Sequence, residues 1–320
     1  MQRATCYRRH PIAKVRTNAR AVFCFVSRMP SLRPMIATAC LAVAAACGDS
    51  GPGDASAARL ADPVLVGAGD IASCLFSGDE ATARLLDEIP GTVFTVGDNA
   101  YRSGDGNPMS CYNASWGRHK SRTRPVPGNH EYHEGYIDQY FDYFGSAAGE
   151  RGKGYYSYNL GRWHIIALNS VISTHWSDEQ GKWLKEDLAR NRHACTLAYY
   201  HHPRFSSGPN SLSTQSQELW WMLAEGGVDV VVNGHDHIYE RFAPLNKNGE
   251  RDDDRGMRQF IVGTGGATRY EIRREAPNSE VRNTGTFGVL KLTLKPGGYD
   301  WKFVPVRGSR FTDSGSDSCH

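Results

Sequence analysis

Short polar motifs follow several apolar runs that have the length and composition of β-strands. The runs Val64–Ala68, Thr92–Val96 and Val228–Val232 each lead to a glycine and then to Asp or His. Loops that leave the carboxyl ends of strands in an open α/β sheet converge on one crevice, so these polar residues are expected to share a site. In chain order the motifs are Gly69-Asp70, Gly97-Asp98-Asn99-Ala100-Tyr101, Gly128-Asn129-His130-Glu131, His201-His202-Pro203 and Gly234-His235-Asp236-His237.

The side chains in these motifs are ligands for hard or borderline metal ions, namely carboxylate, phenol, amide and imidazole. Asp98 has two oxygens and can bridge two cations that lie about 3.5–4 Å apart, and Asp70 adds a second anion. His235 and His237, two residues apart in a turn, can point into one cavity. A single Gly-Asp after a strand is equally typical of a turn or a helix cap, so the prediction of a two-metal hydrolytic site depends on the whole set.

The remaining polar residues divide into ligands and proton donors. Only one of the adjacent pair His201 and His202 is expected to point into the site, and the other is a candidate acid or a neighbour of a ligand. The amide oxygen of Asn129 can bind a cation without adding charge. His130 is placed to contact substrate or to protonate a leaving oxygen; the alternative is a turn histidine that caps the following helix. Glu131 is expected to hold the loop.

Together the motifs resemble the calcineurin-like metallophosphoesterase superfamily over residues 66–266, and most of all its purple acid phosphatase branch. Two details favour that branch. Asp70 is followed by Ile71-Ala72, so the Asp-x-His of most other members is absent, and Tyr101 stands three residues after Asp98, where the purple enzymes have an iron-binding tyrosine. The resemblance implies an α/β sandwich with two central mixed sheets flanked by helices.

The resemblance also implies a ligand set and a reaction. One ion, Fe(III), would bind Asp70, Asp98, Tyr101 and His237. The second, Zn, Mn or Fe(II), would bind Asp98, Asn129, His201 and His235. His130 matches the histidine that contacts substrate, and His202 is the second catalytic candidate. The implied activity is that of an acid phosphatase, in which a metal-bound hydroxide attacks a small phosphomonoester.

Three other functions fit parts of the pattern. A phosphodiesterase or nucleotidase could use the same scaffold, because the leaving-group preference depends on loops 102–120, 132–153 and 204–214. A metal- or phosphate-binding surface lipoprotein without activity would not need both metals and an additional histidine. A structural module would leave acids and imidazoles buried without a partner, which is costly.

The N-terminal region has the pattern of an export signal. Arg33 precedes an apolar stretch, Met35–Ala46, whose small residues lead into Cys47. This stretch resembles a bacterial lipoprotein signal with Cys47 as the lipidated residue; the alternative is a disordered basic tail. We therefore expect a targeting segment (1–47), a flexible linker (48–61) and one catalytic domain (62–320) of a protein exported to the periplasm or cell surface, its only membrane contact being the lipid anchor.

Charge and cysteines support this division. Residues 1–46 contain eight Lys or Arg and no Asp or Glu, which leaves 29 basic and 34 acidic residues in the rest of the chain. A mildly acidic body gives no electrostatic reason to expect nucleic-acid binding.

Four cysteines follow Cys47, and an even number in an exported protein predicts two disulfides. Of the three pairings we favour Cys74–Cys111 with Cys195–Cys319, because Cys74 and Cys111 both lie just past ligand-bearing strands.

Several secondary-structure predictions test this interpretation. The segments Tyr155–Asn159 and His164–Leu168 are predicted to form a hairpin, and Val289–Leu294 with Asp300–Val304 a second one. Ser177–Ala189 is predicted to be a helix that Ser177 caps and that Gln180 completes as a capping box. The aromatic stretch Tyr136–Phe144 is expected to lie in the core.

Overall fold

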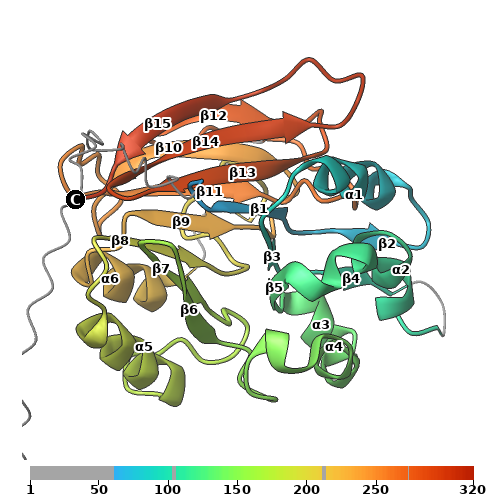
Figure 1. Ribbon diagram of the computed structural model, residues 1–320, viewed down its shortest axis with the longest axis horizontal. Coiled ribbons are helices and arrows are strands. Elements are labelled where there is room, and N and C mark those ends of the chain that lie inside the picture. The colour runs from blue at the N-terminus through green and yellow to red at the C-terminus, as the bar shows by residue number, and fades with distance from the viewer. Residues whose placement is uncertain (1–60, 103–105, 211–213, 273) are drawn as a thin grey trace, which may run out of the picture. The chain divides into compact units, whose positions relative to one another are not determined.

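Two mixed β-sheets form the centre of the fold in the computed structural model, which describes residues 61–102, 106–210, 214–272 and 274–320 (Figure 1). The expected targeting segment (1–47) and nearly all of the expected linker (48–61) lie outside the described residues, so both stay predictions. Among the residues that the structure describes, no helix is both long enough and apolar enough to span a membrane.

The first sheet has six strands in the order β15-β14-β13-β1-β3-β5. Strands β1, β3 and β5 run parallel, so their carboxyl ends lie at one edge, and the other three strands pair antiparallel. The strands are β1 (Val64–Ala68), β3 (Thr92–Val96), β5 (Thr123–Val126), β13 (Gly288–Lys295), β14 (Gly298–Pro305) and β15 (Ser314–Ser318).

The second sheet has seven strands in the order β12-β10-β11-β9-β8-β7-β6. Its four central strands, β11, β9, β8 and β7, are parallel, so their carboxyl ends also share an edge. The strands are β6 (Tyr156–Leu160), β7 (Trp163–Ala167), β8 (Cys195–Tyr199), β9 (Val230–Asn233), β10 (Tyr239–Leu245), β11 (Met257–Val262) and β12 (Ser279–Asn283). A short parallel pair, β2 (Ala72–Ser73) and β4 (Ala100–Tyr101), continues beyond β1 and β3.

Helices cover the outer sides of the sheets. Figure 1 shows α1 to α4 beside the first sheet and α5 with α6 beside the second. The helices are α1 (Gly78–Glu88), α2 (Met109–Ala114), α3 (Asn129–His133), α4 (Ile137–Phe144), α5 (Glu179–Arg190) and α6 (Gln217–Glu225), with 3₁₀ turns at Trp116–Arg122 and Gly145–Ala148.

Alternating side chains of the second sheet belong to two different cores. Ile165 of β7 and Val232 of β9 pack in the same cluster as Leu290 of the first sheet, between the two sheets. Their neighbours in sequence, Ile166 and Val231, pack instead with residues of α5 and α6. Successive side chains of a strand point to opposite faces, so a strand that is buried on both faces needs apolar residues at every position. This is why these strands appear in the sequence as continuous apolar runs.

Most of the expected architecture is confirmed. The fold is the predicted α/β sandwich of two mixed sheets, both predicted hairpins form as β6–β7 and β13–β14, and the aromatic stretch forms α4 with Tyr140, Phe141 and Phe144 buried. Strands β10, β12 and β15 were not predicted from the sequence.

The predicted capping box is wrong. Asp178, not Ser177, stands at the start of α5, and Gln180 is buried. The Gln180 amide forms two hydrogen bonds with the backbone of Asn169, accepting from its N–H at 2.8 Å and donating to its carbonyl at 2.9 Å. The buried backbone of Asn169 needs both a hydrogen-bond donor and an acceptor, and the Gln180 side chain supplies both. This side chain is therefore not available to cap the start of α5.

Both predicted disulfides are present, Cys74–Cys111 and Cys195–Cys319. The first joins the residue after β2 to α2. The second ties the residue after β15 to the buried first residue of β8, and so fixes the chain end of the first sheet to the second sheet. Next to it, the backbone N–H of His320 donates to Asp229 at 2.9 Å.

Removing the second disulfide should lower stability. The bond joins residues 124 positions apart, and a cross-link over a loop of this length typically contributes about 2–4 kcal/mol. We expect Cys319→Ser to lower the free energy of unfolding by about this amount in a denaturant titration under non-reducing conditions. In excess reductant the difference between wild type and variant should vanish; equal stability of the two oxidised proteins would contradict the prediction.

Candidate metal centre

Three motif residues hold the backbone in a left-handed conformation that side chains other than glycine rarely adopt. The φ angles are 58° at Asp70, 49° at Asp98 and 69° at His235; Asn278 is the only other such residue among the described non-glycine residues. Each of the three directly follows a strand-end glycine. Such conformations cost of order 1–3 kcal/mol each and cluster at functional sites. The strained turns point three chemically active side chains from different strands toward one place.

One group of donors surrounds the phenol of Tyr101. Its hydroxyl lies 3.0 Å from Asp70 Oδ1, 3.4 Å from Asp98 Oδ2 and 3.0 Å from His237 Nε2. His237 Nε2 is also 3.2 Å from Asp70 Oδ1. The phenol of Tyr101 thus contacts all three other side chains that were expected to bind the first metal.

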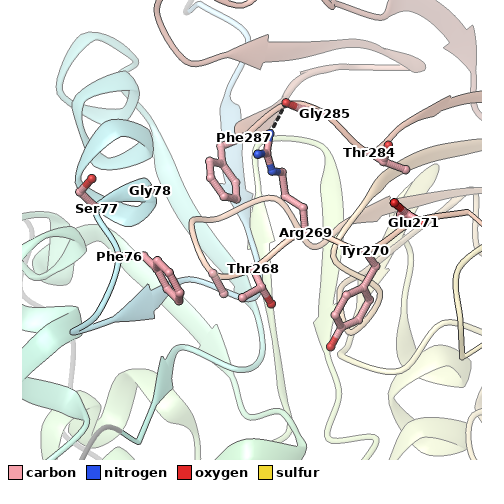
Figure 2. A pocket seen from close by; sticks show the side chains of 11 residues that line it. Phe76, Ser77, Gly78, Thr268, Arg269, Tyr270, Glu271, Thr284, Gly285 and Phe287 are labelled. Carbon is pink, nitrogen blue, oxygen red and sulfur yellow. Dashed lines mark hydrogen bonds between the residues drawn. The ribbon is translucent and has the colours of Figure 1, made fainter.

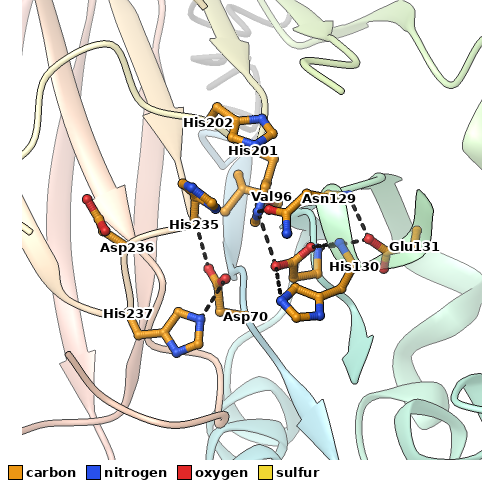
Figure 3. Close-up of polar contacts among 12 residues, drawn as sticks. Asp70, Val96, Asn129, His130, Glu131, His201, His202, His235, Asp236 and His237 are labelled. Carbon is orange, nitrogen blue, oxygen red and sulfur yellow. Dashed lines mark hydrogen bonds and ion pairs between the residues drawn. The ribbon is translucent and has the colours of Figure 1, made fainter. Parts of the chain in front are cut away.

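A second group meets the first at Asp98 Oδ2. His201 Nε2 lies 3.2 Å from Asp98 Oδ2 and 3.0 Å from Asn129 Oδ1. The ring of His235 is 5.0 Å from that of His201, centroid to centroid. Figure 3 shows Asn129, His201 and His235 pointing toward one another from the two sheets. Asp98 belongs to both groups, which is the arrangement expected of a bridging ligand.

Backbone carbonyls orient two of the imidazoles. His201 Nδ1 lies 2.8 Å from the carbonyl of Val96, and His237 Nδ1 lies 2.7 Å from that of Thr268. A carbonyl only accepts, so a proton is assigned to Nδ1 in each ring, and Nε2 is the nitrogen that faces the carboxylates. Histidines that bind metals are held in this way.

Burial and nearby charges raise the pKa of some of these groups and lower the pKa of others. Burial works against a charge on His201, but the carboxylates of Asp98 and Asp70 outweigh it and raise the pKa of His201 to about 9. Burial and then the charge of His201 lower the pKa of His235 to about 4. Burial opposes ionisation of Asp98 as well, yet the adjacent His201 and His130 keep the pKa of that carboxyl below its usual range.

The donor set fits bound cations. Asp70 and Asp98 are 0% and 1% exposed, and one atom of each lies within 4.8 Å of the other and of a His201 nitrogen. In the described part of the chain, the ion-pair partners of both carboxylates are histidines rather than Lys or Arg. Two buried carboxylates in contact need compensating positive charge, which a metal ion supplies.

The two catalytic candidates differ in environment. The His130 side chain is 33% exposed; its Nδ1 lies 2.6 Å from Glu134 and its Nε2 3.8 Å from Asp98 Oδ2. His202 is buried, its Nδ1 lies 2.9 Å from Ser170 Oγ, and burial followed by the charges of His201 and His235 lowers the pKa of His202 to about 2.

His201 and His202 both lie next to His235, and which of the pair binds a metal stays a prediction. Ring nitrogens of both lie within 4.8 Å of a His235 nitrogen. Strand β8 ends at Tyr199, before either histidine, so the strict alternation of an extended strand no longer separates the two side chains.

Glu131 connects the loops after β3 and β5. Its carboxylate is fully buried and accepts hydrogen bonds from the backbone N–H groups of Gly128 (2.6 Å), Asp98 (3.1 Å) and Asn99 (2.7 Å). Burial and the charge of Asp98 raise the pKa of Glu131 to about 7, against the opposing effect of these donors. This geometry agrees with the expected role of Glu131 in holding the loop.

Tyr270 is a neighbour of the site that the sequence did not reveal. Its ring stacks on His237 with centroids 4.0 Å apart and planes 6° apart. Burial and the charges of Asp70, Asp236 and Asp98 raise the pKa of Tyr270 to about 12. The residue lies in a loop after β11 and outside every motif, so no local pattern could have indicated it.

The chain belongs to the calcineurin-like phosphoesterase family, which matches residues 46–239. Two similar proteins are purple acid phosphatases of Arabidopsis thaliana. Purple acid phosphatase 15 is 28% identical over 204 residues, covering 52% of this chain and 38% of that protein. Purple acid phosphatase 23 is 30% identical over 197 residues, covering 49% and 43%. The chain thus falls on the purple acid phosphatase-like branch, and the matches span about two fifths of these relatives' length.

Solved structures with this fold include purple acid phosphatase PPD1 from yellow lupin, with a TM-score of 0.63 and 19% identity over 80% of this chain and 53% of that one. GAP50 of Plasmodium, described as an anchor in the inner membrane complex, has a TM-score of 0.62 and 15% identity over 81% of this chain and 90% of that one. At these identities the likeness shows the fold alone, so activity has to be argued from the side chains.

Replacing Glu131 should weaken the site without touching any candidate ligand. In Glu131→Gln one oxygen becomes an NH₂ group that faces backbone donors, so we expect a loss of about 1–3 kcal/mol in the free energy of unfolding of the metal-free protein. Metal affinity should fall about 10- to 100-fold, as for other residues that support ligands.

Denaturant titration and metal-binding calorimetry measure the two effects. Glu134→Gln is the comparison, because the Glu134 side chain is partly exposed, contacts His130 and accepts the backbone N–H of Arg102 at 2.7 Å, but bonds none of the three backbone N–H groups that Glu131 holds. Unchanged metal affinity in Glu131→Gln would show that the loops hold their shape without this carboxylate.

Proposed function

We propose that the chain is an exported hydrolase of small phosphomonoesters that uses two metal ions. The observation that supports this most strongly is the pair of donor groups that share Asp98. Asp70, Asp98, Tyr101 and His237 would hold one ion, and Asp98, Asn129, His201 and His235 the other. The phenol favours Fe(III) in the first group, and the second group suits Zn, Mn or Fe(II). Such ions offset the charge of phosphate oxygens and lower the pKa of a bound water.

His130 is the group that we assign to proton transfer. It is exposed enough to meet a substrate, and its Nδ1 lies 2.6 Å from a carboxylate oxygen of Glu134, which orients the ring. Nε2, the nitrogen on the side of Asp98, would donate its proton to the leaving oxygen of the ester as the bond to phosphorus breaks. His202 is too buried to hold a proton near neutral pH, so we propose that it positions His235 instead.

Export is proposed from the N-terminal pattern and the disulfides. Two disulfides in the described residues fit an oxidising compartment. The expected lipid anchor at Cys47 lies outside the described residues. Mass spectrometry of the protein from a membrane fraction tests it, because diacylglycerol on Cys47 adds a defined mass.

Metal content, a visible spectrum and turnover of a phosphomonoester together test the proposal. For purified residues 48–320 we expect two metal ions per chain, an iron-tyrosinate charge-transfer band and hydrolysis of phosphomonoesters. Tyr101→Phe should remove the band, whereas Tyr270→Phe, which changes the tyrosine stacked on His237, should keep it. Two bound metals without a band would exclude the Fe(III) assignment, and a metal-loaded protein without turnover would exclude the hydrolase.

The division between ligands and proton donor is tested by comparing single histidine variants. We expect His235→Ala to lose metal together with activity. His130→Ala should retain both metals while kcat falls about 10²- to 10⁴-fold. His133→Ala, an exposed histidine on the same helix α3, is the control and should change neither. Loss of metal from His130→Ala would overturn the assigned role.

A further inference from the structure

A cavity of about 640 Å³ opens beside the candidate metal centre. Three segments line it: the turn before α1 at residues 76–78, the loop after β11 at residues 267–271, and residues 284–287 that lead into β13. Figure 2 shows Phe76 and Phe287 on one side and Tyr270 on the other. The cavity is therefore bounded by aromatic rings from separate parts of the chain.

Backbone and ring contacts tie one wall of this cavity to the candidate ligands. The N–H of Ala267 donates to the carbonyl of Asp70 at 3.0 Å, and that of Tyr270 donates to the carbonyl of His237 at 3.2 Å. Tyr270 both lines the cavity and stacks on the His237 imidazole. One wall of the cavity is therefore in direct contact with the candidate ligands Asp70 and His237.

The opposite wall holds an aromatic side chain in water. Phe76 is 54% exposed, although an apolar ring of this size is normally buried. Its backbone N–H donates to the carbonyl of Ser73 at 3.1 Å, and the Cys74–Cys111 disulfide anchors the same turn. Ser73 in turn pairs with Tyr101 in the short sheet of β2 and β4. The backbone of the turn that carries Phe76 is thus tied to the short sheet that contains Tyr101.

The charges around the cavity nearly cancel. The guanidinium of Arg269 lies 5.2 Å from the centroid of the Phe287 ring and donates to the carbonyl of Gly285 at 2.5 Å. Glu271 contributes an opposite charge to the same lining. The lining therefore offers aromatic surface and almost no net charge.

We propose that this cavity binds the organic group of an aromatic phosphomonoester, and that Phe76 is a specificity-determining residue. The inference rests on the proposed hydrolase activity. The ring of the substrate would pack between Phe76 and Tyr270, with Phe287 behind it, while the phosphate occupies the metal centre. Aromatic pairs of this kind contribute about 0.5–1.5 kcal/mol beyond the area that they bury.

The test compares an aromatic and an aliphatic substrate in matched variants. For Phe76→Ala we expect kcat/KM for 1-naphthyl phosphate to fall about three- to tenfold, mainly through KM, with kcat/KM for glycerol 2-phosphate unchanged. Leu75→Ala is the control, because Leu75 is the adjacent residue, 73% exposed, and does not line the cavity. Equal losses on both substrates, no loss on either, or the same selective loss in Leu75→Ala would overturn the inference.

A binding measurement separates this inference from the proposed activity. Calorimetry on the metal-loaded protein with 1-naphthylmethylphosphonate and methylphosphonate needs no turnover. We expect wild type to prefer the naphthyl compound and Phe76→Ala to lose that preference. Binding preference without hydrolysis would retain the cavity assignment and reject the hydrolase; hydrolysis with equal affinity for both phosphonates would do the reverse.

Discussion

The carboxylate of Asp70 is the group through which the two sheets meet. It follows β1 of the first sheet, yet its Oδ2 accepts the backbone N–H of His235, which follows β9 of the second sheet, at 2.9 Å. Its Oδ1 contacts Tyr101 and His237. Buried polar atoms are nearly always hydrogen-bonded, and the two oxygens of this one anion find partners on both sheets.

The backbone around Asp70 reinforces the same junction. The N–H of Gly69 donates to the carbonyl of Val262 in the second sheet, and the carbonyl of Gly69 accepts from Gly265. A Cβ built on Gly263 would lie 2.9 Å from Asp70 Oδ2 and 2.2 Å from the carbonyl of Asp236. Gly263 is therefore needed because the backbone passes too close to Asp70 and Asp236 for a side chain.

The sequence predicted the strands and the ligand motifs well because both depend on local signals. Apolar runs of five residues mark buried strands, and a glycine followed by Asp or His marks a sharp turn at the strand end. Strands β10 and β12 lack such signals, since β10 contains Glu240, Arg241 and Pro244 and β12 is polar. The buried Glu240 is stabilised by Ser207 and Ser279, partners that only the folded chain brings together.

Side-chain roles were harder to predict than side-chain identities. The sequence assigned Asp98 and His235 to one site, and the structure brings them together. The sequence could not show that His202 packs against His235 or that Tyr270 stacks on His237, because both contacts join separate loops. The two halves of the donor set come from different sheets, with Asp70, Asp98 and Asn129 from the first and His201, His235 and His237 from the second. Their distances therefore depend on how Phe94 and Tyr199 pack between the sheets, with ring centroids 5.7 Å apart. A core substitution that shifts one sheet against the other would change the distance between the candidate ligands of the first sheet and those of the second, but not the spacing of the ligands within either sheet. The geometry of the metal centre therefore depends on the packing between the sheets as well as on the ligands themselves.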